Sequence, residues 1–257
     1  MQDLISVITN DHIDENKLNS AYDFHCRGHN RNILNFTPYP PKITKLSNDS
    51  IHMMEFKENN FGGKVIDCHP KKIHKQKRKP SCREFYEKNA PLSNKIFKSL
   101  LFNSFGQDLK KNGRRPYPSA GAFYATEIII FVQNVEGIEV GSYHYLPISH
   151  KLEKLNYTTK EKVTDSLLLN KNKLKNFDFF ILYASLASRY IAKYGMRGYR
   201  LACLEVGSMY QNFISCSEKL GLTGCLWGGF IDEELSVNLG TDPRVLWPMV
   251  CQVLGRQ

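Results

Sequence analysis

Four short stretches of the sequence combine cations, hydroxyls and glycines in ways that could bind a flat, anionic ligand. In the first, Lys79, Ser81 and Arg83 fall within five residues. Two cations and a hydroxyl at this spacing can hold a phosphate and an electron-rich carbonyl oxygen. The alternative is an ordinary solvated basic segment, which the spacing alone favours.

The second stretch is a loop with the sequence Arg-Arg-Pro-Tyr-Pro-Ser-Ala-Gly-Ala at 114–122. Its small residues let a flat ligand approach the backbone closely, and its prolines stiffen the chain. The third stretch, 221–230, places glycines around an apolar core after a helical segment. Backbone N–H groups in such a loop could donate to a ring heteroatom. Ordinary turns are the alternative for both stretches.

The fourth stretch places Lys193 next to Tyr194, shortly before the most strongly periodic helix. Such a pair could exchange a proton with a substrate if burial lowered the pKa of the lysine toward neutrality. The alternative is a pair of surface side chains. His25, Cys26 and His29 also lie close together, but their spacing matches no recognised zinc motif, so we expect no metal site.

The elements that must position these stretches are long helices and short strands. The periodicity predicts a helix between Ser93 and Gly106. It predicts a longer helix over 199–220, apolar nearly all round, which should lie in a core or a dimer interface. A polar run predicts a surface helix over 160–176. Apolar runs predict strands at 127–132, 143–145, 177–186 and 249–254. This mixture indicates an α+β protein, or a mixed sheet covered by helices.

The composition excludes several classes of protein. The chain has 257 residues, of which 42% are hydrophobic and 23% charged, as in soluble globular proteins. The net charge is +10, and eight Lys or Arg against one Asp place +7 of it within 64–83. A broad nucleic-acid-binding face is therefore not expected. We also expect no membrane span and no secretory signal. Seven scattered cysteines indicate free thiols in a reducing cytoplasm.

Taken together, these stretches resemble the nitroreductase-fold flavoproteins, and among them the SagB/McbC-type azoline dehydrogenases. The stretch 114–122 matches the signature of that subfamily. Residues 23–28, Asp-Phe-His-Cys-Arg-Gly, resemble the N-terminal segment of the dehydrogenase subunit of microcin-type azole synthetases. Three further segments match in the same order, at 141–147, 193–199 and 205–212. The resemblance covers roughly residues 78–257.

The resemblance implies a fold and an activity. The fold would be α+β and nitroreductase-like, with a mixed or antiparallel sheet flanked by helices, a long central core helix, and FMN at a homodimer interface. Residues 78–257 would form the catalytic domain, and 1–77 an N-terminal extension that acts as a flap or docks partners. The implied activity is FMN-dependent oxidation of peptide-bound thiazolines and oxazolines to thiazoles and oxazoles. It would serve the biosynthesis of a ribosomally made, bacteriocin- or microcin-like peptide.

The resemblance also implies roles for single residues. Lys193 and Tyr194 match the catalytic Lys-Tyr pair of the family, and which of them is the base stays open. Because Lys79 replaces an arginine and loses its bidentate geometry, Arg78 is a second candidate for the phosphate. The implied FMN-binding residues are Arg78, Lys79, Ser81, Arg83, Pro118, Ser119, Ala120, Gly121, Leu226, Gly228, Gly229 and Arg256.

The implied partners are a YcaO-type cyclodehydratase, an E1-like leader-binding subunit and a precursor peptide. The chain would be a homodimer within a larger cytoplasmic complex, without nucleic acid, membrane or metal. Two alternatives stay open. One is an NAD(P)H-dependent nitro- or quinone reductase of the same fold, and the other is a flavin-free scaffold subunit. The basic run at 64–83 could dock partners or an acidic leader, or serve as a solubilising flap.

Overall fold

The computed structural model describes residues 14–29, 47–49, 68, 79–85, 90–110, 113–155, 159–167 and 176–256. Residues 1–31 and 79–257 cluster into one unit, and residues 32–78 into a second. All strands of the described residues belong to the first unit. The expected boundary between residues 77 and 78 falls outside the described residues, as does Arg78, and both expectations stay predictions.

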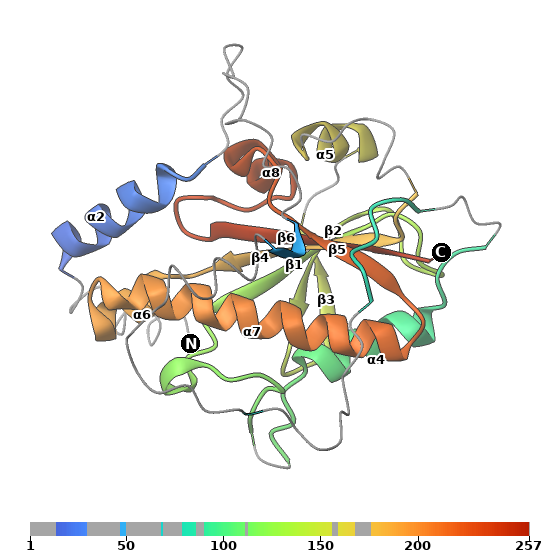
Figure 1. The fold of residues 1–257 in the computed structure, drawn as a ribbon, viewed down its shortest axis with the longest axis horizontal. Helices are drawn as coiled ribbons and strands as arrows, with labels where there is room; N and C mark the ends of the chain where they lie inside the picture. The colour runs from blue at the N-terminus through green and yellow to red at the C-terminus, as the bar shows by residue number, and fades with distance from the viewer. Residues whose placement is uncertain are drawn as a thin grey trace. The chain divides into compact units, whose positions relative to one another are not determined.

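A six-stranded sheet lies at the centre of the first unit (Figure 1). Its strands follow the order β3-β2-β1-β4-β6-β5, and every neighbouring pair is antiparallel. The central strands β1 and β4 are buried on both faces, because their sequences are nearly continuous apolar runs. The strands are β1 Thr126–Val132, β2 Gly141–Leu146, β3 Lys151–Lys154, β4 Phe179–Ser185, β5 Thr223–Trp227 and β6 Trp247–Gly255.

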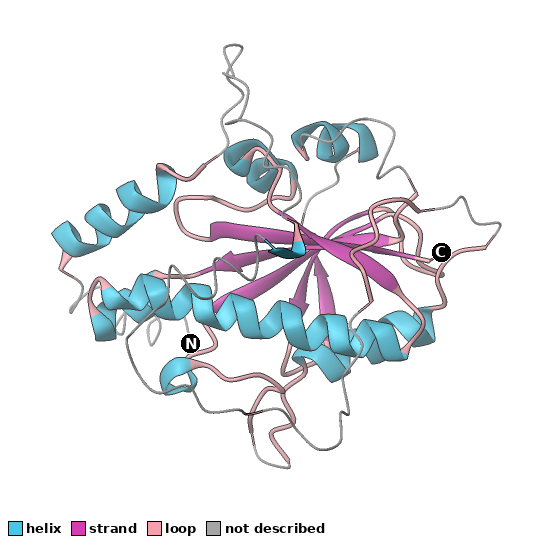
Figure 2. Cartoon of the chain, viewed as in Figure 1, coloured by secondary structure: helices cyan, strands magenta, loops and turns pink. Residues whose placement is uncertain are grey.

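Helices cover both faces of this sheet (Figure 2). On one face, α4 and α7 bury Phe97 and Phe213 against β1 and β4. On the other face, α5 and α8 bury Val163 and Leu235. This α+β architecture with an antiparallel sheet confirms the nitroreductase-like fold. The helices are α2 Glu15–Cys26, α4 Asn94–Phe105, the short η1 Ala120–Ala122, α5 Lys160–Ser166, α6 Ser188–Tyr194, α7 Arg197–Lys219 and α8 Asp232–Asn238.

Helix α7 crosses one face of the sheet and is buried on one side only. Val206, Met209 and Phe213 lie in the core, whereas Gln211 is exposed and Leu204 is 61% exposed. The prediction that this helix lies in a core is confirmed for one of its sides, whereas the other side is exposed and carries polar residues such as Gln211 beside Leu204. The exposed side is a surface on which a second molecule could pack.

Two predicted elements differ from the structure. The helix expected over 160–176 ends at Ser166, and residues 168–175 lie outside the described part. It is also no simple surface helix, since Val163 is buried. The glycine-rich stretch 221–230, expected to be a loop, contains the edge strand β5. Gly224 permits this pairing, because a Cβ there would overlap the carbonyl oxygen of Val253 in β6.

Helix α2 belongs to the part of the chain expected to be an extension, and it packs on the main unit. Its first turn is capped by Asp14, whose carboxylate accepts from the backbone N–H of Asn16 and Lys17. Near its end, His25 stacks on Trp247 of β6, with ring centroids 5.1 Å apart. The N-terminal helix is therefore part of the same packed unit as the sheet.

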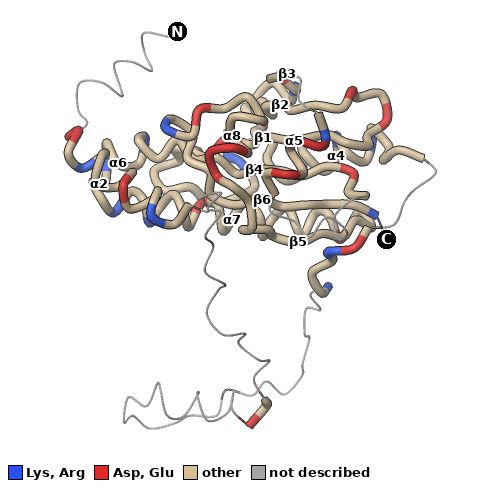
Figure 3. Tube along the Cα trace, turned by 90° about the horizontal axis from the view of Figure 1, so that it is seen from above, with Lys and Arg blue, Asp and Glu red and all other residues tan. Residues whose placement is uncertain are grey.

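Charge and hydropathy agree with an ordinary globular surface over the described residues. Asp and Glu positions lie among Lys and Arg positions along the described segments of the Cα trace (Figure 3). No helix in the described part of the chain is long and apolar enough to cross a membrane. No group of three or more His, Cys, Asp or Glu residues in that part could hold a metal ion.

Candidate functional site

The loop before β1 has an unusual backbone conformation. Gly121, Ala122 and Tyr124 have φ values of 64°, 54° and 47°, a region that residues with a Cβ rarely adopt. Ser119 holds the loop, because its Oγ accepts from the backbone N–H of Tyr124 at 2.8 Å. The Tyr124 hydroxyl in turn accepts from the backbone N–H of Arg115 at 3.2 Å. The loop is strained but fixed at both ends.

The end of α6 brings the predicted catalytic pair against this loop. A Cβ at position 121 would lie 2.8 Å from the Tyr194 hydroxyl and 3.4 Å from Lys193 Nζ. A side chain at position 121 would therefore crowd the Tyr194 hydroxyl, and glycine leaves it room, whereas Lys193 Nζ would stay at contact distance. Lys193 Nζ also lies 4.9 Å from the centre of the Phe123 ring, within the range of a cation–π contact. Two stretches that are far apart in the sequence thus meet in the structure.

A buried carboxylate on α7 supports the same region. Glu205 is 2% exposed. Its Oε2 accepts from the Tyr190 hydroxyl at 2.6 Å, and its Oε1 accepts from the backbone N–H of Thr126 at 2.8 Å. The Tyr190 hydroxyl also lies 2.7 Å from Ser119 Oγ. Burial, together with the hydrogen bond to Glu205, raises the pKa of Tyr190 well above its usual range. Tyr190 therefore stays protonated and can donate.

This buried set was missed by sequence reasoning. The residues around Glu205 matched the family, but no role followed for that side chain, and Tyr190 was not noticed. A signal was present. Glu205 falls between Ala202 and Met209, at the i, i+3, i+4 spacing of one helix face, and both neighbours are buried. A carboxylate on the buried face of a helix needs hydrogen-bond partners.

The predicted phosphate-binding segment, 79–83, lies beside the start of β5. The backbone N–H of Cys82 donates to the carbonyl oxygen of Gly224 at 3.0 Å. The backbone N–H of Lys79 donates to Glu218 Oε1 at 3.2 Å, near the end of α7. The segment is thus fixed to β5 and to α7 by its backbone.

The residues that follow on β5 are close to this segment. Burial raises the pKa of the Cys225 thiol to about 11, and the nearby charge of Arg83 acts against that rise. Leu226 is 36% exposed, although both of its neighbours in the strand are more buried. Past the strand, the Trp227 indole donates to the carbonyl oxygen of Gly229 at 2.7 Å and fixes the turn.

Arg256 lies at the far end of β6 and pairs with a buried carboxylate. Its Nη2 lies 2.7 Å from Asp178 Oδ1, and its Nε lies 2.9 Å from Asp178 Oδ2. The guanidinium also donates to the carbonyl oxygens of Ala90 and Pro91. Arg256 therefore fastens the segment before α4 to the sheet, and its contact with a phosphate stays a prediction.

The two groups of predicted site residues lie near different ends of α7. Glu205 supports the loop and the Lys193–Tyr194 pair, whereas Glu218 contacts the phosphate segment. These two glutamates are thirteen positions apart, which is about 20 Å along a helix at 1.5 Å per residue. The predicted site residues of this chain therefore fall into two separate groups.

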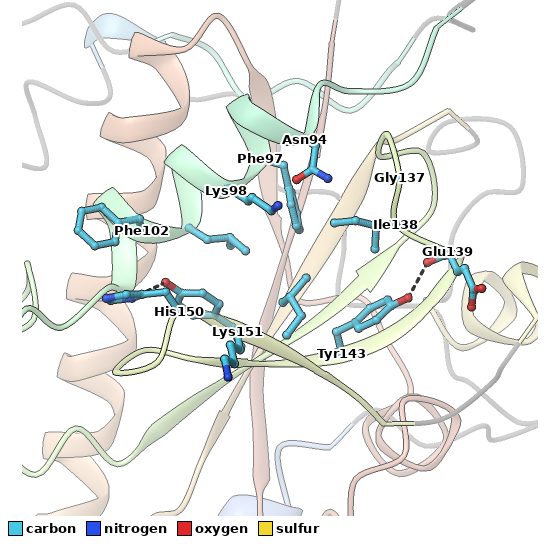
Figure 4. Close-up of a pocket in the computed structure, with 13 residues that line it drawn as sticks. Asn94, Phe97, Lys98, Phe102, Gly137, Ile138, Glu139, Tyr143, His150 and Lys151 are labelled. Carbon is cyan, nitrogen blue, oxygen red and sulfur yellow. Dashed lines mark hydrogen bonds between the residues drawn. The ribbon is translucent and has the colours of Figure 1, made fainter.

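Two hollows open on this side of the sheet. One, of about 550 Å³, is lined by the loop itself, from Arg114 to Tyr124. The other, of about 770 Å³, lies between α4 and the β2–β3 hairpin (Figure 4), where Phe97 and Lys98 face Tyr143. None of the predicted site residues lines this second hollow, whereas Pro118 and Ser119 line the first.

The match to a family model decides where the chain belongs. The model described as the nitroreductase family matches residues 77–256. The chain belongs to the nitroreductase family. The match begins within one residue of the start expected for the catalytic domain, and it spans the loop, α6, α7 and β6.

Similar proteins narrow the place of this chain within the family. It is 31% identical over 246 residues to the microcin B17-processing protein McbC of Escherichia coli, covering 91% of this chain and 88% of that one. It is 28% identical over 114 residues to the trifolitoxin-processing protein TfxB of Rhizobium leguminosarum bv. trifolii, covering 42% and 31%.

A solved structure supports the same placement. It is the E. coli microcin synthetase McbBCD complex with truncated pro-MccB17 bound. The present chain aligns with one chain of that complex at a TM-score of 0.77 and 28% identity, covering 98% of this chain and 97% of that one. Together with the sequence match, this confirms the resemblance to the SagB/McbC-type dehydrogenases of the nitroreductase fold.

Proposed function

We propose that the protein is an FMN-dependent dehydrogenase that oxidises peptide-bound thiazolines and oxazolines to thiazoles and oxazoles. The observation that carries this proposal is the meeting of Lys193 and Tyr194 with the strained loop at Gly121. The similarity to McbC and TfxB, which process microcin B17 and trifolitoxin, supports peptide maturation as the context.

The residues beside β5 fit FMN. The side chains of Lys79 and Arg83 form no ion pair within the described residues, so their charges are available for a phosphate. With Ser81 they would hold the phosphate and the ribityl chain. Backbone groups near Leu226 and Gly229 would face the ring. When bound, FMN supplies the acceptor for a hydride.

The chain itself must supply the proton chemistry. Oxidising an azoline removes a proton from the ring carbon next to the carbonyl and a hydride from the adjacent ring carbon. Lys193 and Tyr194 would take that proton or orient the ring while it leaves. Gly121 lets both approach the loop, and Phe123 holds the ammonium in place.

Mass spectrometry tests this function. The substrate would be a heterocyclised precursor peptide, incubated with the protein, FMN and its partner cyclodehydratase, and each oxidised ring should lose ~2 Da as the cofactor takes two hydrogens. Lys193→Ala and Tyr194→Phe should each lower turnover by about 10²-fold or more while FMN stays bound. Lys98→Ala, which changes a distant exposed lysine, is the control. Normal turnover in both site variants would refute the assignment. Rapid NAD(P)H oxidation without peptide would favour a nitro- or quinone reductase instead.

The proposal includes a homodimer with FMN between two copies. Antiparallel pairing along the exposed side of α7 would bring segment 79–83 of one copy to the loop at Gly121 of the other. Leu204 is exposed on that side, and Gly207 there has open space around it, so the backbones of two helices could approach closely.

The proposal also places the dimer in a larger assembly. The related McbBCD structure is a complex with a truncated precursor bound. By that analogy, the partners here would be a YcaO-type cyclodehydratase, an E1-like leader-binding subunit and the precursor peptide, in the cytoplasm. The assembly would be tested by copurification. The protein should copurify with these subunits from a host that expresses all of them.

A further inference from the structure

We propose that Glu205 and Tyr190 are positioning residues, which hold the strained loop and the Lys193–Tyr194 pair in one fixed arrangement. The role of that arrangement in azoline oxidation rests on the proposed function. The arrangement itself is carried by hydrogen bonds and ring contacts in this chain alone.

The direction of the hydrogen bonds fixes the role of Ser119. Tyr190 donates its single hydroxyl proton to Glu205 Oε2 at 2.6 Å. The Ser119 hydroxyl must therefore donate to the oxygen of Tyr190, from which it lies 2.7 Å away. Ser119 also accepts from the backbone N–H of Tyr124. Its only proton is thus committed to Tyr190, and Ser119 shapes the loop rather than donating to a ligand.

Glu205 secures the loop at both ends. Through Tyr190 it holds Ser119, and with its other oxygen it accepts from the backbone N–H of Thr126, where β1 begins. The residues between these points include Ala122 and Tyr124, both at positive φ. Such conformations persist only where the surrounding structure holds them. One carboxylate on α7 therefore holds both ends of the turn. The hydrogen-bonded set of Ser119, Tyr190 and Glu205 is called the clamp below.

The ring of Tyr190 contacts both the loop and the catalytic pair. Its centroid lies 5.9 Å from that of Phe123 and 6.4 Å from that of Tyr194. Helix α7 presses on the same residue, since a Cβ at Gly198 would overlap the Tyr190 backbone. Tyr190 thus contacts the loop through its hydroxyl and the catalytic pair through its ring, and α7 fixes its position.

Two variants separate the parts of this clamp. Tyr190→Phe keeps the ring but removes the link between Ser119 and Glu205. Amide hydrogen exchange at Tyr124 and Thr126 should then quicken by about tenfold, the loss of one hydrogen bond. With FMN bound, kcat should fall by about 10- to 100-fold, because the reacting groups are displaced, whereas KM should change little.

Glu205→Gln tests the donor–acceptor direction of the hydrogen bonds that run from Ser119 through Tyr190 to position 205. The new amide would still accept from Thr126, but its NH₂ group would donate to Tyr190 and turn the tyrosine proton toward Ser119. Exchange at Thr126 and at Tyr124 should therefore both stay slow, because the Ser119 oxygen has two lone pairs and can accept from Tyr190 and from the backbone N–H of Tyr124 together. Tyr183→Phe is the matched control, since it removes another buried hydroxyl, which donates to Gln252 at 2.7 Å and takes no part in the hydrogen bonds that join Ser119, Tyr190 and Glu205. It should lower the melting temperature without changing exchange at Tyr124 or Thr126, or kcat.

The outcomes distinguish this inference from the proposed function. Unchanged exchange at Tyr124 in Tyr190→Phe overturns the clamp, whatever the protein catalyses. Faster exchange with unchanged kcat, in a wild type that oxidises azolines, overturns the positioning role. Faster exchange in a chain whose wild type binds FMN but oxidises no azoline supports the clamp and refutes the proposed function.

Discussion

Gly121 offers the sharpest single test of the site geometry. Replacing it with alanine has two separable effects. The first is backbone strain, because a residue with a Cβ at φ 64° pays about 1–2 kcal/mol in the left-handed region. The second is a collision with one group, because the new Cβ would lie 2.8 Å from the Tyr194 hydroxyl, whereas Lys193 Nζ at 3.4 Å stays at contact distance. Ordinary contact begins near 3.4 Å, so the tyrosine must move by several tenths of an ångström.

Each effect has its own expected size. The strain should lower the melting temperature by about 2–4 °C per kcal/mol for a chain of this length. The displacement should lower kcat by about 10- to 100-fold, since a misplacement of roughly 1 Å can reduce the rate by a factor of about 10². Turnover is measured by the mass loss of the azoline peptide, and stability by thermal unfolding with FMN present.

Gly137→Ala is the matched control for Gly121→Ala. Gly137 has φ 67°, and a Cβ there would meet Asn94 Nδ2 at 3.5 Å, an ordinary contact. The control should show the same loss of stability with normal kcat. Normal kcat in Gly121→Ala, or an equal loss of kcat in both variants, would refute the reasoning. It would show that glycine is not needed to leave room for Tyr194 beside Lys193.

Three further predictions concern stability and assembly. Arg256→Ala should reduce the free energy of unfolding by about 3 kcal/mol in urea, because it leaves the buried Asp178 carboxylate without its cation. The exposed pair Arg244–Asp242 should matter by less than about 1 kcal/mol when Arg244 becomes alanine. Burial and the charge of His29 lower the pKa of His25 from 6.5 to about 4, which favours the neutral ring in the folded state. Its contribution to stability is therefore complete above pH 6.5 and is lost as the pH falls toward 4, by about 3 kcal/mol in total. His25→Gln should flatten that decline, and an unchanged slope would contradict this assignment. Leu204→Glu should convert a dimer to a monomer in sedimentation, whereas Val237→Glu, equally exposed on α8, should not.

The sequence predicted those elements whose own residues suffice to specify them. Strands β1 and β4 are runs of β-branched and aromatic residues, and α4 carries a regular apolar stripe between Ser93 and Gly106. Strand β5 was missed because Gly224 weakens strand propensity, and only the backbone of β6 explains why glycine is needed there. Helix α6 is seven residues long, too short to show a period.

The candidate site was predicted in pieces. The loop at Gly121 and the pair Lys193–Tyr194 were identified by resemblance, but their contact depends on how α6 packs, which no local pattern encodes. Glu205 was hidden because α7 was interpreted as apolar all round. A carboxylate on a buried helix face indicates a polar network, but the partner, Tyr190, lies fifteen residues away and is visible only once the helices pack.

The position of β6 in the sheet has a consequence for how this protein is made. Strand β6 follows the other five in the chain, yet it lies between β4 and β5, and among the strands of the described residues it alone pairs with β5. During synthesis, β4 and β5 therefore have unpaired edges until Trp247–Gly255 has been translated. Open strand edges are templates for wrong pairing. A chain truncated before Trp247 should thus stay bound to chaperones or aggregate in inclusion bodies. Such a chain would nevertheless contain every residue of the Lys193–Tyr194 site.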